Sequence, residues 1–385
     1  MSGERLKNRF TKKLIFHIHN LSRGGAERVV VNLSGYFARD GYEVKIVTEE
    51  TARTEYDLPD GVERIDAGVD AGSGARRHGE KTGVVRRFLN IRQRRARLRR
   101  VLKSEAPDLV IAFGKSANYR AVPAAKGICP VLVSVRNDPH KDYTGRLNAL
   151  FNRKYLYKAD GCVFQTKEAQ AFFPAVLREK SRIILNPINE KYLHVDAPET
   201  RKKVIVNVGR IAVQKNQALL IRAFAKLGET LPGYELRIYG SDSGDGTKEQ
   251  LDGLVREYRL ENAVVFCGSS DSLEKEIPDC ALFVLSSDYE GLPNALMEAM
   301  AMCMPVIATD CPCGGAAMVI KDGVNGCLVP TGDSDALASA MEKMLRDPEY
   351  AERLGTEAGK IGELANGERI YGQWKDYVEE LCADS

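Results

Sequence analysis

No stretch of the sequence comes near the roughly 18 consecutive apolar residues that a membrane-spanning helix needs. The longest apolar runs, such as residues 281–285, are only as long as a strand. The amino terminus is charged and lacks the apolar segment of a secretory signal. The nine cysteines are odd in number and are scattered without the spacing of a disulfide framework. We therefore expect a cytosolic protein with reduced thiols.

The composition is that of a soluble globular protein, with 385 residues of which 44% are hydrophobic and 28% are charged. This length predicts two domains. The net charge of +3 is distributed unevenly along the chain. Residues 1–190 hold 36 Lys and Arg against 21 Asp and Glu, whereas residues 191–385 hold 20 against 32. The basic half predicts an anionic partner, which could be a nucleic acid, a membrane or a phosphorylated substrate.

Short apolar runs alternate with helical patterns along the whole chain, which predicts an α/β protein with parallel sheets covered on both faces. The expected strands are 14–19, 42–48, 109–113, 131–135, 162–165 and 182–185 in the first half, and 204–208, 235–239, 263–267, 281–285 and 305–308 in the second. Two such series predict two facing doubly wound, Rossmann-like domains with a ligand cleft between them. We place them at 1–187 and 188–366, with a C-terminal helix over about 367–385 packing back on the first domain.

Three motifs stand where strands are expected to end. Gly24 and Gly25 open a helix, and their amides could approach a phosphate, although a plain tight turn explains two glycines equally simply. The dinucleotide pattern G-x-G-x-x-G is absent from this loop, which argues against a nicotinamide enzyme. Arg210 and Lys215 flank the exit of strand 204–208. An arginine fork and a lysine together suit a diphosphate, although two solvated surface cations are the simpler reading of this motif alone.

Glu290 and Glu298 follow the strand 281–285, one in a loop and one inside a helix that we expect to begin at Asn294. The two carboxylates would reach different parts of one extended ligand, such as the hydroxyls of a sugar and of a ribose. Amides near Gly291 would point along the helix axis at an anion. Exposed carboxylates are usually only solvated, so this pair alone is weak evidence for a ligand site and is interpreted together with the other motifs.

The three motifs in this order resemble the retaining GT-B glycosyltransferases of family 4. The resemblance covers nearly the whole chain and includes 309–315, 321–326 and 328–330. It implies a glycosyltransferase, a hexosyltransferase of class EC 2.4.1.-, that needs neither a metal nor a cofactor and uses a nucleotide-diphosphate sugar, most often a UDP-sugar. The implied donor-binding residues are Gly24, Gly25, Arg210, Lys215, Glu290, Gly291, Leu292, Asn294 and Glu298.

Within that resemblance, Arg210 and Lys215 would hold the diphosphate and stabilise the charge of the leaving group, and Glu290 would bind the transferred sugar; these three are the implied catalytic residues. Glu298 would bind the ribose. Many relatives carry a histidine after the fifth strand of the first domain, where this chain has Arg136 and then Asn137. This form is similar to members that build bacterial surface polysaccharides and lipid-linked glycans, so we assign both residues to the acceptor or the membrane.

Residues 76–103 contain ten arginines and two lysines against one glutamate. We expect a helix from about 82 to 104 that buries its apolar residues and turns its arginines outward. Arg94, Arg95, Arg99 and Arg100 would then contact an anionic membrane surface. A solvated face is the alternative, and no nucleic-acid motif supports a nucleic-acid partner.

The resemblance implies transfer of a hexose or N-acetylhexosamine from a UDP-sugar, with retention, and we expect a polyprenyl-diphosphate-linked glycan as the acceptor. The enzyme is expected to be cytoplasmic and peripheral on the inner membrane. The alternatives are a hydrolysing epimerase of the same fold, which favours more acid/base groups than five histidines supply, and a non-catalytic binding protein.

Overall fold

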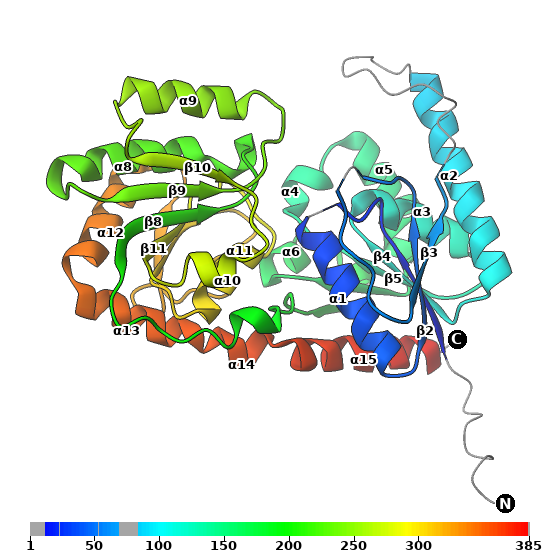
Figure 1. Ribbon diagram of the computed structural model, residues 1–385. Coiled ribbons are helices and arrows are strands. Elements are labelled where there is room, and N and C mark those ends of the chain that lie inside the picture. The colour runs from blue at the N-terminus through cyan, green and yellow to red at the C-terminus, as the bar shows by residue number, and fades with distance from the viewer. Residues whose placement is uncertain (1–11, 23, 53, 69–83, 384–385) are drawn as a thin grey trace, which may run out of the picture. The chain divides into compact units, whose positions relative to one another are not determined.

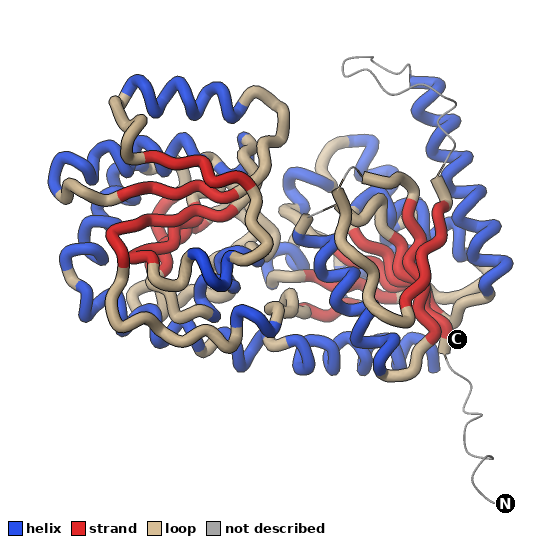
Figure 2. Tube along the Cα trace, viewed as in Figure 1, coloured by secondary structure: helices blue, strands red, loops and turns tan. Residues whose placement is uncertain are grey.

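The computed structural model describes residues 12–22, 24–52, 54–68 and 84–383. The chain divides into two compact units (Figure 1). The first unit consists of Met1–Ile184 and Tyr371–Ser385, and the second of Leu185–Ile370. Each unit is built around one parallel sheet with helices on both faces (Figure 2). The predicted α/β class with two doubly wound parallel sheets is therefore confirmed.

The first unit has a seven-stranded parallel sheet in the order β3-β2-β1-β4-β5-β6-β7. Its strands are β1 (Lys13–His17), β2 (Glu43–Thr48), β3 (Val62–Asp66), β4 (Leu109–Phe113), β5 (Val131–Ser134), β6 (Gly161–Phe164) and β7 (Ser181–Ile183). Its helices are α1 (Gly25–Arg39), α2 (Val84–Glu105), α3 (Lys115–Ala125), α4 (Pro139–Asp142), α5 (Arg146–Lys154), the 3-10 turn η1 (Leu156–Lys158), α6 (Lys167–Ala171) and α7 (Ala175–Arg178). The order reverses between β1 and β4, so the carboxyl ends of these strands form the switch point.

The last helix, α15 (Gly367–Ala383), contributes its residues from Tyr371 onward to the first unit. The ring of Tyr371 stacks on Tyr36 of α1 at 5.4 Å, and its hydroxyl donates to Asp40 at 2.5 Å. Trp374 is fully buried and stacks on Phe113 at the end of β4, at 5.6 Å. In the described part of the chain, α15 and every other helix are too short or too polar to cross a membrane.

The second unit has a six-stranded parallel sheet in the order β10-β9-β8-β11-β12-β13. Its strands are β8 (Lys202–Val208), β9 (Glu235–Tyr239), β10 (Val264–Gly268), β11 (Cys280–Leu285), β12 (Val306–Asp310) and β13 (Cys327–Pro330). Its helices are η2 (Glu190–Tyr192), η3 (Val213–Lys215), α8 (Gln217–Thr230), α9 (Thr247–Glu257), α10 (Leu273–Glu276), α11 (Asn294–Ala301), α12 (Ser334–Arg346), α13 (Pro348–Gly359) and α14 (Ile361–Ala365).

The core of the second unit lies on both faces of its sheet. Val204 and Val206 of β8 belong to one apolar cluster, whereas Ile205 between them belongs to another. Successive side chains of a strand point to opposite faces, so an unbroken apolar strand requires cover on both sides. The order of this sheet reverses between β8 and β11, which pair directly. The loops that leave these two strands therefore meet at one edge of the sheet.

Candidate active site

Lys215 and Glu290 come together at the edge where β8 and β11 end. Lys215 Nζ lies 2.5 Å from Glu290 Oε1, and Ser287 Oγ donates to the same oxygen at 2.6 Å. Glu290 is buried, and the side chain of Lys215 is 19% exposed. The stem of Lys215 is turned toward the strand exit, since a Cβ at Gly209 would lie 3.3 Å from Lys215 Cδ. The site thus holds a buried carboxylate paired with a lysine, and Arg210, which follows β8 after Gly209, is exposed.

Side chains from both loops fix this arrangement. Asn216 adopts a left-handed conformation with φ of 42°, and its side chain caps α8 by accepting from Leu219 N. Its amide nitrogen donates to Asp288 Oδ1 at 2.7 Å, and Gln214 Nε2 donates to Tyr289 O at 2.8 Å. Gln214, Asp288 and Ser287 were not predicted as site residues. Their only sequence signal is that they lie in the stretches that follow the strands 204–208 and 281–285.

The loop before α11 packs closely against Gly315 in the loop after β12. A Cβ at Gly315 would lie 1.6 Å from the carbonyl oxygen of Gly291, so only glycine lets the loop after β12 approach. Gly291 and Leu292 are buried, and the helix begins at Asn294 as expected. Asn186 Nδ2 donates to Asn294 Oδ1 at 2.5 Å. Glu298 is 6% exposed inside α11. The structure thus gathers Gly291, Asn294 and Glu298 in one loop and helix after β11.

α1 begins at Gly25, and Gly24 is its N-cap residue, so the two glycines open the helix as the sequence indicates. A Cβ at Gly24 would lie 2.3 Å from a carboxylate oxygen of Glu27, so the glycine leaves room for an acid of the first turn. A carboxylate at this position already interacts favourably with the positive end of the helix. A phosphate that bound at the amino terminus of α1 would therefore meet the charge of Glu27.

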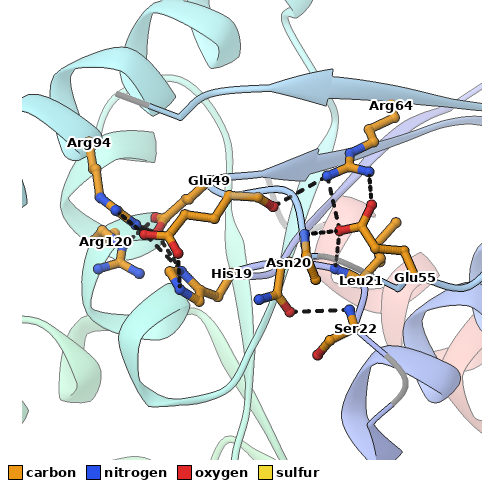
Figure 3. Close-up of polar contacts among 11 residues, drawn as sticks. His19, Asn20, Leu21, Ser22, Glu49, Glu55, Arg64, Arg94 and Arg120 are labelled. Carbon is orange, nitrogen blue, oxygen red and sulfur yellow. Dashed lines mark hydrogen bonds and ion pairs between the residues drawn. The ribbon is translucent and has the colours of Figure 1, made fainter. Parts of the chain in front are cut away.

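A buried charged cluster around Glu49 lies at the carboxyl ends of β1 and β2 (Figure 3). The side chain of Glu49 is 2% exposed. Its oxygens lie 3.2 Å from His17 Nε2, 3.2 Å from His19 Nδ1 and 3.1 Å from Arg94 Nη1, and Arg120 completes the ring of partners. Burial alone would raise the pKa of Glu49, but the bonds to His17 and His19 and the nearby charges hold it well below its usual range. This cluster was not predicted, because its members are far apart in the chain.

Glu55 forms a second anchor for the loop that follows β1 (Figure 3). Arg64 Nη1 lies 2.5 Å from Glu55 Oε2. Glu55 Oε1 accepts from Ala52 N at 2.8 Å and from Leu21 N at 3.4 Å. Glu49 contacts His19 and Glu55 contacts Leu21, so both carboxylates fix the segment between β1 and the glycine loop.

The expected outward orientation of the α2 arginines is wrong for two of the four. Arg94 is directed into the domain, where it pairs with Glu49 and Glu50, and its side chain is only 12% exposed. Arg99 Nη1 donates to the carbonyls of Ala124, at 2.6 Å, and Lys126, at 2.9 Å. Successive residues of a helix point in different directions, so arginines spread along α2 cannot all face outward. Those on the inner side of α2 bind the carboxylates and backbone carbonyls of the domain. Arg95 and Arg100 are exposed, whereas Arg76, Arg77 and the side chains of Arg86 and Arg87 lie outside the described residues.

Arg136 is half-buried in the first unit, where its guanidinium group lies over two aromatic rings. Its guanidinium carbon is 4.5 Å from the centre of the Phe113 ring and 5.4 Å from that of Trp374. Burial lowers the pKa of Arg136 to about 9. Asn137 is half-buried beside it and bonds the carboxyl of Asp142. The assignment of Arg136 and Asn137 to the acceptor or the membrane stays a prediction.

Comparison with known proteins gives the family. Residues 189–361 match the model described as glycosyl transferases group 1, and residues 23–192 match Glycosyltransferase Family 4. An uncharacterized glycosyltransferase of Methanocaldococcus jannaschii is 30% identical over 348 residues, which cover 75% of this chain and 83% of that protein. The chain belongs to the family 4 GT-B glycosyltransferases. The resemblance read from the three motifs is thereby confirmed.

Two further likenesses concern this glycosyltransferase over nearly its full length. The N-acetylgalactosamine-N,N'-diacetylbacillosaminyl-diphospho-undecaprenol 4-alpha-N-acetylgalactosaminyltransferase of Campylobacter jejuni is 26% identical over 353 residues, or 87% of this chain and 91% of that one. The solved structure of HepE from Anabaena, in complex with UDP and glucose, superposes with a TM-score of 0.77 at 18% identity. It covers 96% of this chain and 100% of that one, and it shows the fold.

Proposed function

We propose that this glycosyltransferase moves a hexose or N-acetylhexosamine from a UDP-sugar, with retention at the anomeric carbon and without a metal ion. The observation that carries the proposal is the 2.5 Å contact between Lys215 and Glu290. In a nucleotide sugar, the sugar and the diphosphate are joined through a single oxygen. A group that binds the diphosphate and a group that binds the transferred sugar must therefore be neighbours, as these two residues are.

The charges at this edge suit the departure of a nucleoside diphosphate. As the bond between the anomeric carbon and the phosphate oxygen breaks, negative charge collects on the leaving phosphate. Lys215 and the exposed Arg210 supply positive charge at the place where it collects, which lowers the barrier electrostatically. The acceptor oxygen then bonds to the same face of the sugar, and its proton passes to the leaving phosphate oxygen. This step requires no nucleophile from the protein. Glu298 would hold the ribose.

The donor and acceptor are inferred from relatives together with the charge of this chain. A structural neighbour was solved with UDP and glucose, and a relative is named for a diphospho-undecaprenol acceptor. Residues 1–190 carry the excess of positive charge that a diphosphate-linked lipid and an anionic leaflet would attract. We infer an acceptor linked to polyprenyl diphosphate, in bacterial polysaccharide or glycoconjugate biosynthesis. The enzyme would act on the cytoplasmic face of the inner membrane.

A panel of nucleotide sugars tests this function. The purified chain is incubated with UDP-, GDP-, dTDP- and ADP-sugars, with and without lipid-linked acceptors, and the released nucleotide and sugar are identified. We expect release of UDP that an acceptor accelerates. Release of a sugar with changed ring stereochemistry would indicate a hydrolysing epimerase, and tight binding with no turnover of any donor would indicate a binding protein.

A further inference from the structure

Helix α5 carries the two most exposed large apolar side chains in the described part of the first unit. Leu147 is 70% exposed and Leu150 is 63% exposed. The opposite side of the helix is anchored, since Tyr119 of α3 packs on Phe151 at 5.6 Å and donates to Asn152 Oδ1 at 2.6 Å. Because the inner face of α5 is fixed by these contacts, the exposure of the two leucines is not due to a loosely packed helix.

Basic residues surround the two leucines on the same face. Arg146, Arg153 and Lys154 are exposed, and at 100° per residue they fall within the same arc as Leu147 and Leu150. Lys154 Nζ lies 5.5 Å from the centre of the Tyr155 ring. The sequence of α5 contains no acidic residue. Its outer face therefore combines apolar side chains with charge of one sign only, as in helices that lie in the surface of an anionic bilayer.

We propose that α5 is the element by which the first unit docks on an anionic lipid surface, with Leu147 and Leu150 entering the acyl region. This rests on the proposed function, because a lipid-linked acceptor brings the enzyme to a membrane. The exposed arginines of α2, Arg95 and Arg100, add attraction at a distance. The charge of α5 disfavours a second copy as the occupant, because a symmetric contact would set the three cations of α5 against their own copies.

Sedimentation with vesicles tests the docking surface with matched variants. The wild type should bind vesicles rich in phosphatidylglycerol and not phosphatidylcholine vesicles, and 1 M salt should weaken binding because the Debye length shrinks to about 3 Å. Leu147→Gln with Leu150→Gln should lower the partition coefficient about 100-fold, at roughly tenfold per leucine. Leu364→Gln, at a leucine of the second unit that is 50% exposed, is the control and should bind as the wild type does. Retained binding by the double variant would overturn the proposal.

A fluorescent reporter separates insertion from electrostatic attraction alone. The chain has one tryptophan, Trp374, and it is fully buried, so the change caused by Leu150→Trp belongs to the new side chain. Brominated lipids should quench this reporter and leave a Val213→Trp reporter in the second unit unaffected. Equal or absent quenching would contradict the insertion of α5. So would a dimer of the wild type that Leu147→Gln dissociates, because the occupant would then be a second copy.

Donor hydrolysis distinguishes the failure of this proposal from the failure of the proposed function. The Leu147→Gln, Leu150→Gln variant should release UDP from the donor at the wild-type rate in the absence of vesicles. Loss of vesicle binding with donor hydrolysis intact supports both proposals. A wild type that binds vesicles through α5 but consumes no donor would refute the function and leave the docking surface standing.

Discussion

Lys215 and Glu290 form a pair in which the carboxylate is buried and the lysine is partly buried. Ser287 donates to the same carboxylate oxygen that the lysine contacts, so this oxygen has two partners. Removing one member of a buried ion pair leaves an uncompensated charge, which typically costs about 3–5 kcal/mol. Arg210 is exposed, so its removal leaves no buried charge without a partner. Substitutions at these two cations should therefore affect stability differently, even where they affect turnover alike.

The first prediction concerns the diphosphate cations. Arg210→Ala and Lys215→Ala should each lower kcat/KM by roughly two to three orders of magnitude, because each removes positive charge from the leaving phosphate. Thermal unfolding should show an unchanged midpoint for Arg210→Ala and a lowered one for Lys215→Ala. Wild-type turnover in either variant would remove that residue from the proposed mechanism, and a matched exposed substitution, Arg222→Ala on α8, serves as control.

The second prediction separates the two glutamates. Glu290→Gln should strongly lower kcat, because it changes the group beside the reacting sugar, yet it should leave the affinity for free UDP equal or higher, since Lys215 loses its partner charge. Glu298→Gln should weaken the binding of UDP by removing a ribose contact. Calorimetry with UDP alone, without the sugar, measures the UDP affinity of both variants, and a turnover assay measures kcat. A loss of UDP affinity in Glu290→Gln and not in Glu298→Gln would show that the roles are reversed.

At the scale of elements, the sequence allows prediction of the loops that carry whole motifs better than of clusters assembled from distant segments. Glu290, Asn294 and the start of α11 lie in one continuous stretch, so their spacing already placed them together. Glu49 is different, because it follows β2 and its partners come from β1, α2 and α3. No local pattern marks such a residue. The same cluster draws Arg94 inward, which the excess of arginines in α2 could not indicate.

The strands that sequence reasoning missed lie at the edges of the sheets. β3 has the sequence Val-Glu-Arg-Ile-Asp, of which only Val62 is buried, and β13 is a short strand that ends in proline. Central strands such as β4 are buried throughout and are therefore recognisable as unbroken apolar runs. An edge strand pairs on one side only and tolerates polar residues and proline, which removes the signal.

The third prediction concerns acid unfolding. The pKa of Glu49 is lower in the folded chain than its ordinary value of about 4.3, so its contribution to stability is present above that pH and is lost as the pH falls below it. Glu49→Gln should lower the free energy of unfolding at pH 7 by about 3–5 kcal/mol, because Arg94 and Arg120 lose their buried partner. Urea unfolding from pH 7 to pH 3 should then show a shallower acid decline in the variant. An equally steep decline would place the acid-sensitive group elsewhere.

At the scale of the whole molecule, the uneven charge of the chain has a partial structural explanation. The basic first half includes cations that are satisfied internally, such as Arg94 and Arg99, so the formal excess overstates the charge at the surface. What remains outside includes Arg95 and Arg100 on α2 and the outer face of α5. Net charge predicted an anionic partner, but only the fold shows which cations can meet one.

We propose that Arg210, Lys215 and Glu290 carry out retaining transfer from a UDP-sugar. The most direct test follows the anomeric proton by NMR during turnover of the UDP-sugar that the panel identifies, with an acceptor present. The first-formed glycoside should have the anomeric configuration of the donor, and Arg210→Ala should slow its appearance by roughly two to three orders of magnitude. A product of inverted configuration, or one that forms at the wild-type rate in that variant, would contradict the account.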